Sequence, residues 1–292
     1  MAKLLVTGAS GFLGWNLCQL AAPDWEVYGV CRSHPLAIPK VKSVRADLTD
    51  FQAVQPLLQS VKPDAVIHLA AESSPNRCQQ QPELSHRINV DASVNLARLC
   101  ADARIPYVFA SSEQVFDGLN PPYKETDSVS PINLYGEQKA LAEEKILDCY
   151  SSAAVCRLPL MFGAAPPGAS SFLQPFMQTL QEGRSLQLFV DEFRTPASST
   201  TVAKGLLLAL EKVQGILHLG GRDRISRYDF GQLMVEVFDL PVEGLTASRQ
   251  GDVAMAAPRP PDVSLDNSKA FALGYAPASL REELAALRGL VE

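Results

Sequence analysis

Residues 7–14 read Thr-Gly-Ala-Ser-Gly-Phe-Leu-Gly, and they follow an apolar run at 4–6 and precede a helical pattern. The three glycines have the spacing G-x-x-G-x-x-G. Gly8 permits a tight turn, Gly11 lets the backbone approach a diphosphate, and Gly14 lets the helix pack closely on the strand. The free N–H groups at the helix start would then face the anion. This strand, turn and helix predict a dinucleotide-binding α/β fold.

The surroundings of this turn matter, because a lone glycine pattern is weak evidence. An ordinary glycine-bearing turn is the alternative interpretation. A P-loop is excluded, since Trp15-Asn16 stands where Lys and Ser or Thr would be needed. The residues expected to contact the diphosphate are Gly8, Ser10, Gly11, Phe12, Leu13 and Gly14.

Short strand-like runs alternate with helical patterns along the first 160 residues. This rhythm predicts a Rossmann-type, doubly wound parallel sheet with helices on both faces. We also expect a later helix and strand, within about 196–220, to return to this sheet. The expected strands are 3–6, 26–30, a short one near 44–45, 64–69, 107–110, 154–158 and 215–220, and the expected helices are 14–22, 89–102, 135–149, 201–213 and a last one from about 279.

The composition changes near residue 160, where prolines and glycines accumulate up to Gly168. We therefore expect a dinucleotide-binding domain at 1–160, to which the return segment at about 196–220 also belongs. A small mixed substrate-binding domain would comprise 161–195 and 221–292.

The composition bounds the class of protein. The chain has 292 residues, is 47% hydrophobic and 20% charged, and has a net charge of −6. These values fit a globular protein with a sizeable core and argue against a nucleic-acid partner. The six cysteines form no C-x-x-C pair, so we expect buried free thiols and no metal site. We expect no leader before the first strand, and no apolar run reaches membrane-spanning length, so we also expect a cytoplasmic protein without a membrane partner.

Two positions bear on the choice of cofactor. The second strand ends without the acidic residue that would favour NAD, and Arg32 follows Gly14 by 18 residues. A guanidinium at this place could pair with a 2′-phosphate. We therefore expect NADP, with NAD and a solvated surface arginine as the alternatives. Asp47 and Leu48, after the third strand, are expected to meet the adenine, although Asp47 could also belong to an ordinary turn.

Tyr135 and Lys139 are four residues apart on a predicted helix, so they share one face, about 6 Å apart. An ammonium beside a phenol would lower the tyrosine pKa and make it a usable acid or base. Ser111 and Ser112 end a strand 23 residues upstream of the tyrosine, at the sheet edge where ligands bind. A surface Tyr and Lys is the alternative. The combination predicts a proton-transfer site.

As a set, these motifs resemble the extended short-chain dehydrogenases/reductases. Within that superfamily the resemblance is to the dTDP-4-dehydrorhamnose reductase branch, which is related to the regulatory beta subunit of methionine adenosyltransferase. The stretches that carry it are 6–11 (Val-Thr-Gly-Ala-Ser-Gly), 68–72 (His-Leu-Ala-Ala-Glu), 88–92 (Ile-Asn-Val-Asp-Ala), 115–118 (Val-Phe-Asp-Gly), 121–123 (Pro-Pro-Tyr), 131–136 (Pro-Ile-Asn-Leu-Tyr-Gly) and 157–159 (Arg-Leu-Pro).

The resemblance implies roles for individual residues. Tyr135 would be the acid/base, Lys139 its partner and the holder of the nicotinamide ribose, and Ser112 a ligand of the substrate oxygen. Asn89 would support the proton relay. The remaining implied contacts are Ser111 in the cofactor site, Ala70 and Ala71 beside the adenosine, Pro159 and Leu160 beside the nicotinamide carboxamide, and Arg259 beside the sugar-nucleotide phosphates.

The sequence departs from the reductases at Glu113-Gln114, where they usually have Asp-Tyr. These two residues are therefore candidate substrate contacts, and the departure indicates a substrate that differs from that of the reductases. The leading hypothesis is an NADP(H)-dependent reductase of a nucleotide-linked 4-keto sugar. A sugar-nucleotide epimerase and a dinucleotide-binding regulatory subunit without turnover are the alternatives, and a homodimer through helices 89–102 and 135–149 is a further expectation.

Overall fold

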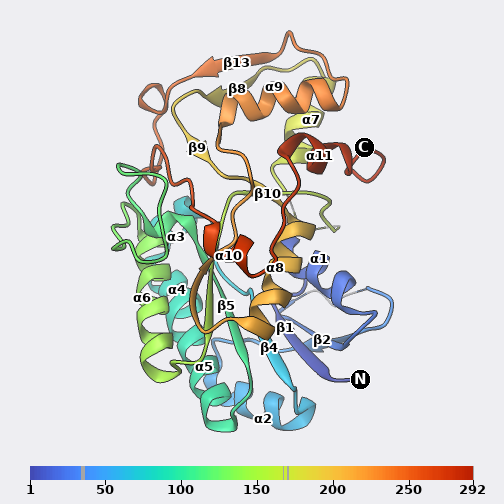
Figure 1. Ribbon diagram of the computed structural model, residues 1–292, viewed down its shortest axis with the longest axis vertical. Helices are drawn as coiled ribbons and strands as arrows, with labels where there is room; N and C mark the ends of the chain where they lie inside the picture. The colour runs from blue at the N-terminus through green and yellow to red at the C-terminus, as the bar shows by residue number, and fades with distance from the viewer. Residues whose placement is uncertain (34–36, 167, 170, 292) are drawn as a thin grey trace.

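The computed structural model describes residues 1–33, 37–166, 168–169 and 171–291. Its centre is a seven-stranded sheet of order β11-β6-β5-β4-β1-β2-β3, in which every neighbouring pair is parallel (Figure 1). The strands are β1 (Lys3–Thr7), β2 (Glu26–Cys31), β3 (Val41–Arg45), β4 (Ala65–His68), β5 (Tyr107–Ser112), β6 (Ala154–Leu158) and β11 (Gly215–His218). The predicted Rossmann-type sheet is confirmed.

The order of the strands reverses at β1, which pairs with β2 on one side and with β4 on the other. In such sheets a crevice opens beyond the carboxyl ends of the strands at this point. The glycine turn follows β1 directly, and the Ser-Ser pair ends β5. The topology therefore brings both sequence motifs to one edge of the sheet.

Helices cover both faces of the sheet (Figure 1). On one face α1 (Phe12–Ala21) and α8 (Ser199–Lys212) pack with the sheet in one apolar cluster. On the other face α2 (Phe51–Val61), α5 (Ala92–Ala103) and α6 (Leu134–Cys149) pack in a second cluster. Burial of these two apolar layers is the main stabilising contribution to the sheet.

Two helical segments differ from the sequence-based expectation. The pattern expected as one helix over 89–102 is a π-helical turn at Arg87–Asp91 that continues into α5. Helix α2 is not among the helices predicted from the sequence, and Pro56 lies inside it. Asp50 compensates at the N-terminus, where its side chain accepts a hydrogen bond from the N–H of Gln52, and burial of Val54 and Leu58 holds the helix to the sheet.

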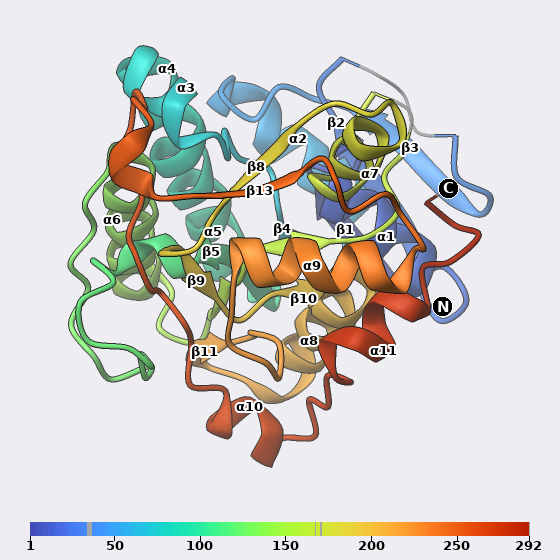
Figure 2. The ribbon, with the colours of Figure 1, turned by 90° about the horizontal axis from the view of Figure 1, so that it is seen from above.

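A smaller part of the molecule, formed by segments from the second half of the chain, lies above the carboxyl ends of the strands (Figures 1 and 2). It has its own apolar core, built from α7 (Leu173–Gln181), β8 (Leu186–Phe189), α9 (Arg227–Val237), β13 (Leu245–Ser248) and α11 (Leu280–Ala285). Strand β11 lies at the edge of the main sheet, as the return segment predicts. The remaining elements are α3 (Pro75–Gln80), α4 (Pro82–His86), η2 (Glu113–Val115), β7 (Met161–Phe162), β9 (Phe193–Arg194), β10 (Ala197–Ser198), β12 (Ile225–Ser226), η3 (Gln250–Asp252) and α10 (Ser268–Ala272).

All six cysteines carry free thiols, and five of them are buried, as expected. Over the described ranges no cluster of three His, Cys, Asp or Glu side chains could hold a metal ion. Within the same ranges none of the helices combines the length and the apolar character needed to cross a bilayer.

Candidate functional site

The glycine turn is folded tightly between β1 and α1. Gly8 has φ +65°, in the left-handed region that favours glycine, and the N–H of Gly11 donates to its carbonyl oxygen at 2.9 Å. A Cβ on Gly14 would lie 2.2 Å from the same oxygen, so only glycine allows this packing. Gly11 is the N-cap of α1, and no side chain caps the helix there. The N-terminus of α1 is therefore available to an anion.

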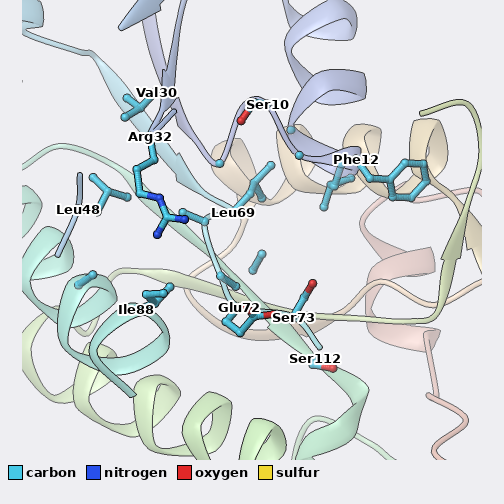
Figure 3. A pocket seen from close by; sticks show the side chains of 18 of the residues that line it. Ser10, Phe12, Val30, Arg32, Leu48, Leu69, Glu72, Ser73, Ile88 and Ser112 are labelled. Carbon is cyan, nitrogen blue, oxygen red and sulfur yellow. The ribbon is translucent and has the colours of Figure 1, made fainter. Parts of the chain in front are cut away.

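A cavity of about 540 Å³ extends from this turn across the carboxyl edge of the sheet (Figure 3). We call it the first cavity. All the predicted cofactor contacts except Leu160 line it, namely Gly8, Ser10, Gly11, Phe12, Leu13, Gly14, Arg32, Asp47, Leu48, Ala70, Ala71, Ser111, Tyr135, Lys139 and Pro159. The residues that line this cavity extend from the N-terminus of α1 to Ser111 and Ser112. This elongated shape fits an extended dinucleotide.

Charged and apolar groups gather at the β2 and β3 end of the first cavity. Arg32 is exposed, and Figure 3 shows its side chain reaching over the cavity opposite Leu48. Asp47 accepts hydrogen bonds from the N–H and the hydroxyl of Thr49, at 2.9 and 2.7 Å. These bonds, with the charge of Arg32, hold the pKa of Asp47 below its usual value. This end therefore offers a cation for a phosphate and a fixed carboxylate.

Tyr135 and Ser112 lie at the opposite end of the first cavity. Tyr135 is buried, and its hydroxyl faces Ser112 closely enough for that side chain to act on its pKa. Burial raises the pKa of Tyr135 to about 12, and the Ser112 contact only partly opposes it. The expected lowering of this pKa by Lys139 is therefore wrong for the structure. At neutral pH the phenol carries its proton, which suits a proton donor better than a base.

The reason lies in the position of Lys139. Its Nζ donates to the carbonyl oxygen of Ala110 at 2.5 Å and lies 4.0 Å from the centre of the Phe109 ring. Burial lowers the pKa of Lys139 to about 7, although the charge of Glu143 opposes the shift. Tyr135 and Lys139 share one helix face, as predicted, but the ammonium is directed at the backbone of β5.

The structure shows the hydrogen bonds of Asn89, which the resemblance assigns to the support of the proton relay. Its Oδ1 accepts from the N–H of Glu72 at 2.9 Å, and its Nδ2 donates to Gln138 Oε1 at 2.8 Å. Within the described chain it forms no hydrogen bond to Lys139 or Tyr135. Asn89 thus anchors the segment after β4, and the arrangement offers no direct link to a proton relay.

A second cavity, of about 510 Å³, adjoins the first below α9 and β8. Five residues line both cavities, namely Ser73, Ser112, Tyr135, Pro159 and Met161. Leu160 lines the second cavity and not the first, between two residues that line both, and its contact with the nicotinamide carboxamide stays a prediction. Ser112 and Tyr135 therefore stand where two cavities meet.

Glu113 lies in the wall of the second cavity and is 3% exposed. Its Oε1 is 3.2 Å from Arg194 Nε, whereas its Oε2 is buried without a hydrogen-bond partner. Burial raises the pKa of Glu113 to about 8, and this effect outweighs the opposing charge of Arg194. The side chain is therefore mostly neutral near pH 7 and can donate a proton in a hydrogen bond.

Gln114 and Arg259, the other two predicted substrate contacts, also line the second cavity. Gln114 Oε1 accepts a hydrogen bond from Asn133 at 3.1 Å. Arg259 Nη2 donates to Asn76 Oδ1 at 3.2 Å, and its Nη1 is buried without a partner. The structure thus brings all three predicted substrate residues to one cavity.

Several residues of the two cavities are not among those predicted from the sequence. In the first cavity, Glu72 and Ile88 belong to stretches that carried the resemblance, and this signal could have found them. In the second cavity, Arg194 and Arg227 come from β9 and from the start of α9. No local pattern marks these two arginines, since they meet Glu113 only through the tertiary fold.

Comparisons with known proteins agree with this geometry. The family model for the RmlD substrate binding domain matches residues 2–289. Methionine adenosyltransferase 2 subunit beta of Xenopus laevis is 34% identical over 93% of this chain and 82% of its own length. The probable low-salt glycan biosynthesis reductase Agl14 of Haloferax volcanii is 32% identical over 97% of this chain and 96% of its own. A crystal structure of dTDP-4-dehydrorhamnose reductase from Bacillus anthracis in complex with NADP superposes with a TM-score of 0.88, at 20% identity and 99% coverage of both chains.

The chain belongs to the RmlD substrate binding domain family. The resemblance predicted from the sequence motifs is confirmed, and so is the assignment to the extended short-chain dehydrogenases/reductases, a superfamily of NAD(P)-dependent oxidoreductases.

Proposed function

We propose that this protein is an NADP(H)-dependent reductase of a nucleotide-linked 4-keto sugar. One observation carries the proposal. Ser112 and Tyr135 lie at the junction of two cavities, one lined by the glycine turn and the other by arginines. A cofactor in the first cavity and a substrate in the second would meet at these two hydroxyl groups.

The first cavity would hold the dinucleotide. The N-terminus of α1 would bind the diphosphate, Arg32 a 2′-phosphate, and Lys139 the nicotinamide ribose. When bound, NADPH would supply a hydride to a carbonyl carbon. The NADP in the Bacillus anthracis structure supports this assignment, and NAD stays the alternative because Arg32 is exposed and makes few contacts of its own.

The protein residues would supply the proton and the orientation. Tyr135 keeps its proton at neutral pH, so its hydroxyl can protonate the carbonyl oxygen as the carbon is reduced. Ser112 would hold that oxygen by a hydrogen bond. Arg259 would bind a phosphate of the nucleotide through its unpartnered Nη1. We further propose that 161–195 and 221–292 act as the substrate-binding part of the chain.

The test is the oxidation of NADPH, followed as absorbance at 340 nm, with a dTDP-linked 4-keto sugar. We expect Tyr135→Phe to lower kcat by about 10²- to 10⁴-fold, the usual contribution of acid–base catalysis, while NADPH binding is retained. NADH in place of NADPH tests the preference for the phosphate. Turnover that survives Tyr135→Phe would contradict the assigned chemistry.

One observation favours a second candidate function. The Xenopus laevis relative is named as a subunit of an adenosyltransferase and is 34% identical over 93% of this chain. A regulatory subunit would bind the dinucleotide, show no turnover with any keto sugar, and co-purify with a catalytic partner. Steady oxidation of NADPH by the isolated chain would exclude this alternative as the whole function.

A further inference from the structure

The second cavity contains a guanidinium that the protein leaves unpaired. Arg227 is the first residue of α9, and its Nη1 is buried without a hydrogen-bond partner. Its side chain forms no ion pair with any residue of the described chain. It lies instead on two aromatic rings, 4.3 Å from the centre of Phe172 and 5.5 Å from that of Phe176. Burial lowers the pKa of Arg227 to about 10, so the group stays charged at neutral pH.

The acidic groups near Arg227 are already engaged elsewhere. Arg194 lies 3.2 Å from Glu113 through Nε and 3.2 Å from Glu192 through Nη2. Both carboxyl groups are thus directed at Arg194, and Glu113 is mostly neutral near pH 7. A guanidinium N–H that is buried without an acceptor is unfavourable for a protein. A ligand that brings a negative charge to Arg227 would remove this cost.

Arg227 and Arg259 enter the second cavity from different parts of the chain. Arg227 rests on the rings of Phe172 and Phe176, whereas Arg259 is hydrogen-bonded to Asn76 of α3. The two arginines therefore offer two separate places for negative charge. The phosphate proposed for Arg259 leaves Arg227 for a second anionic group of the same ligand.

We propose that Arg227 determines substrate specificity by binding an anionic substituent, specifically a carboxylate, on the sugar half of the substrate. This inference rests on the proposed function and narrows its substrate class. A guanidinium binds a carboxylate through two parallel N–H···O bonds, which gives both affinity and orientation. The neutral Glu113 beside it would not repel the anion, and its unpartnered Oε2 can bind a neighbouring hydroxyl.

The experiment is a binding measurement by calorimetry on the full chain loaded with NADP⁺. The ligands are UDP- and dTDP-linked glucose and glucuronate, which differ only in the carboxylate at C6, and UDP and dTDP alone. We expect the wild type to bind the glucuronate form about 10- to 100-fold more tightly than the glucose form. Arg227→Met should abolish this preference, and Arg227→Lys should retain part of it.

Two control variants test whether the effect belongs to Arg227. Arg222 is an exposed arginine five residues away, and Arg222→Met should leave all of these affinities unchanged. Arg259→Met should weaken the binding of both sugar nucleotides and of the free nucleotides equally. A glucuronate preference that persists in Arg227→Met, or no preference in the wild type, overturns the proposal. Weaker binding of UDP or dTDP alone by Arg227→Met also overturns it and assigns Arg227 to the diphosphate. If none of these nucleotides binds, the proposed substrate class itself is contradicted.

Discussion

Two buried sets of charged residues flank the end of β5, and the protein treats them in opposite ways. The first, which we call the closed cluster, comprises Ser111, Glu143 and Arg157. Arg157 donates to Glu143 through Nε and Nη2 at 2.8 to 3.2 Å, and its Nη1 lies 3.4 Å from His218 Nε2. The hydroxyl of Ser111 donates to the same carboxylate. The charges of this cluster are compensated within the protein.

The second set, the open cluster, comprises Glu113, Arg194 and Arg227. Glu113 is only two residues after Ser111, yet it faces the second cavity. Its Oε2 and Nη1 of Arg227 are both buried without partners. Buried polar groups whose partners are satisfied hold a fold in place, whereas those left unsatisfied beside a cavity cost stability and can be paired by a ligand. With the proposal for Arg227, the contrast separates the charges that hold the fold from those that bind a ligand.

The largest effect is expected from opening the closed cluster. Glu143→Ala leaves Arg157 buried and unpaired, which should lower the free energy of unfolding by about 3–5 kcal/mol. Urea denaturation at pH 7 measures it. The exposed neighbour Glu144 provides the control, since Glu144→Ala should change stability by less than about 0.5 kcal/mol. A loss below about 1 kcal/mol for Glu143→Ala would show that the two clusters are energetically alike.

The pH dependence of the open cluster is the next test. The pKa of Glu113 is raised from 4.5 to about 8 in the folded protein, so the folded state binds a proton more tightly than the unfolded state does. Its contribution to stability is therefore complete below about pH 4.5 and is lost as the pH rises towards 8. Since one pKa unit corresponds to about 1.4 kcal/mol, this loss amounts to a few kcal/mol.

Glu113→Gln cannot ionise and isolates this contribution. The difference in unfolding free energy between the wild type and Glu113→Gln should change steadily from pH 5 to pH 8 and then level off. Taking the difference removes the titrations of other groups, such as His68 and Lys139, whose pKa values are lowered by burial. Parallel pH curves for the two proteins would contradict the raised pKa.

The smallest effect is expected from Arg227→Met without ligand. The substitution removes a charged group with an unpartnered buried N–H and also removes the contact with two aromatic rings, and these changes oppose each other. We expect stability to stay within about 1 kcal/mol of the wild type, since cation–π contacts contribute about 0.5–2 kcal/mol. Thermal unfolding measures this, and a drop as large as that of Glu143→Ala would make Arg227 a structural residue.

Much of the first cavity could be predicted from the sequence, because local rules produce it. A glycine turn after a strand gives an anion site wherever the following helix begins. Parallel strands then end at one edge, which brought Ser112 and Tyr135 near this turn. The pKa of Tyr135 could not be predicted in this way, because it depends on burial and on the direction of the Lys139 side chain.

The sequence by itself determined the sheet, the glycine turn and the shared face of Tyr135 and Lys139, since each depends on spacing along one or two neighbouring elements. The tertiary structure alone decided the open cluster. Glu113, Arg194 and Arg227 come from three distant segments, and no periodicity links them. Whether a buried charge is paired or left open depends on what packs beside it, and only the folded chain sets that.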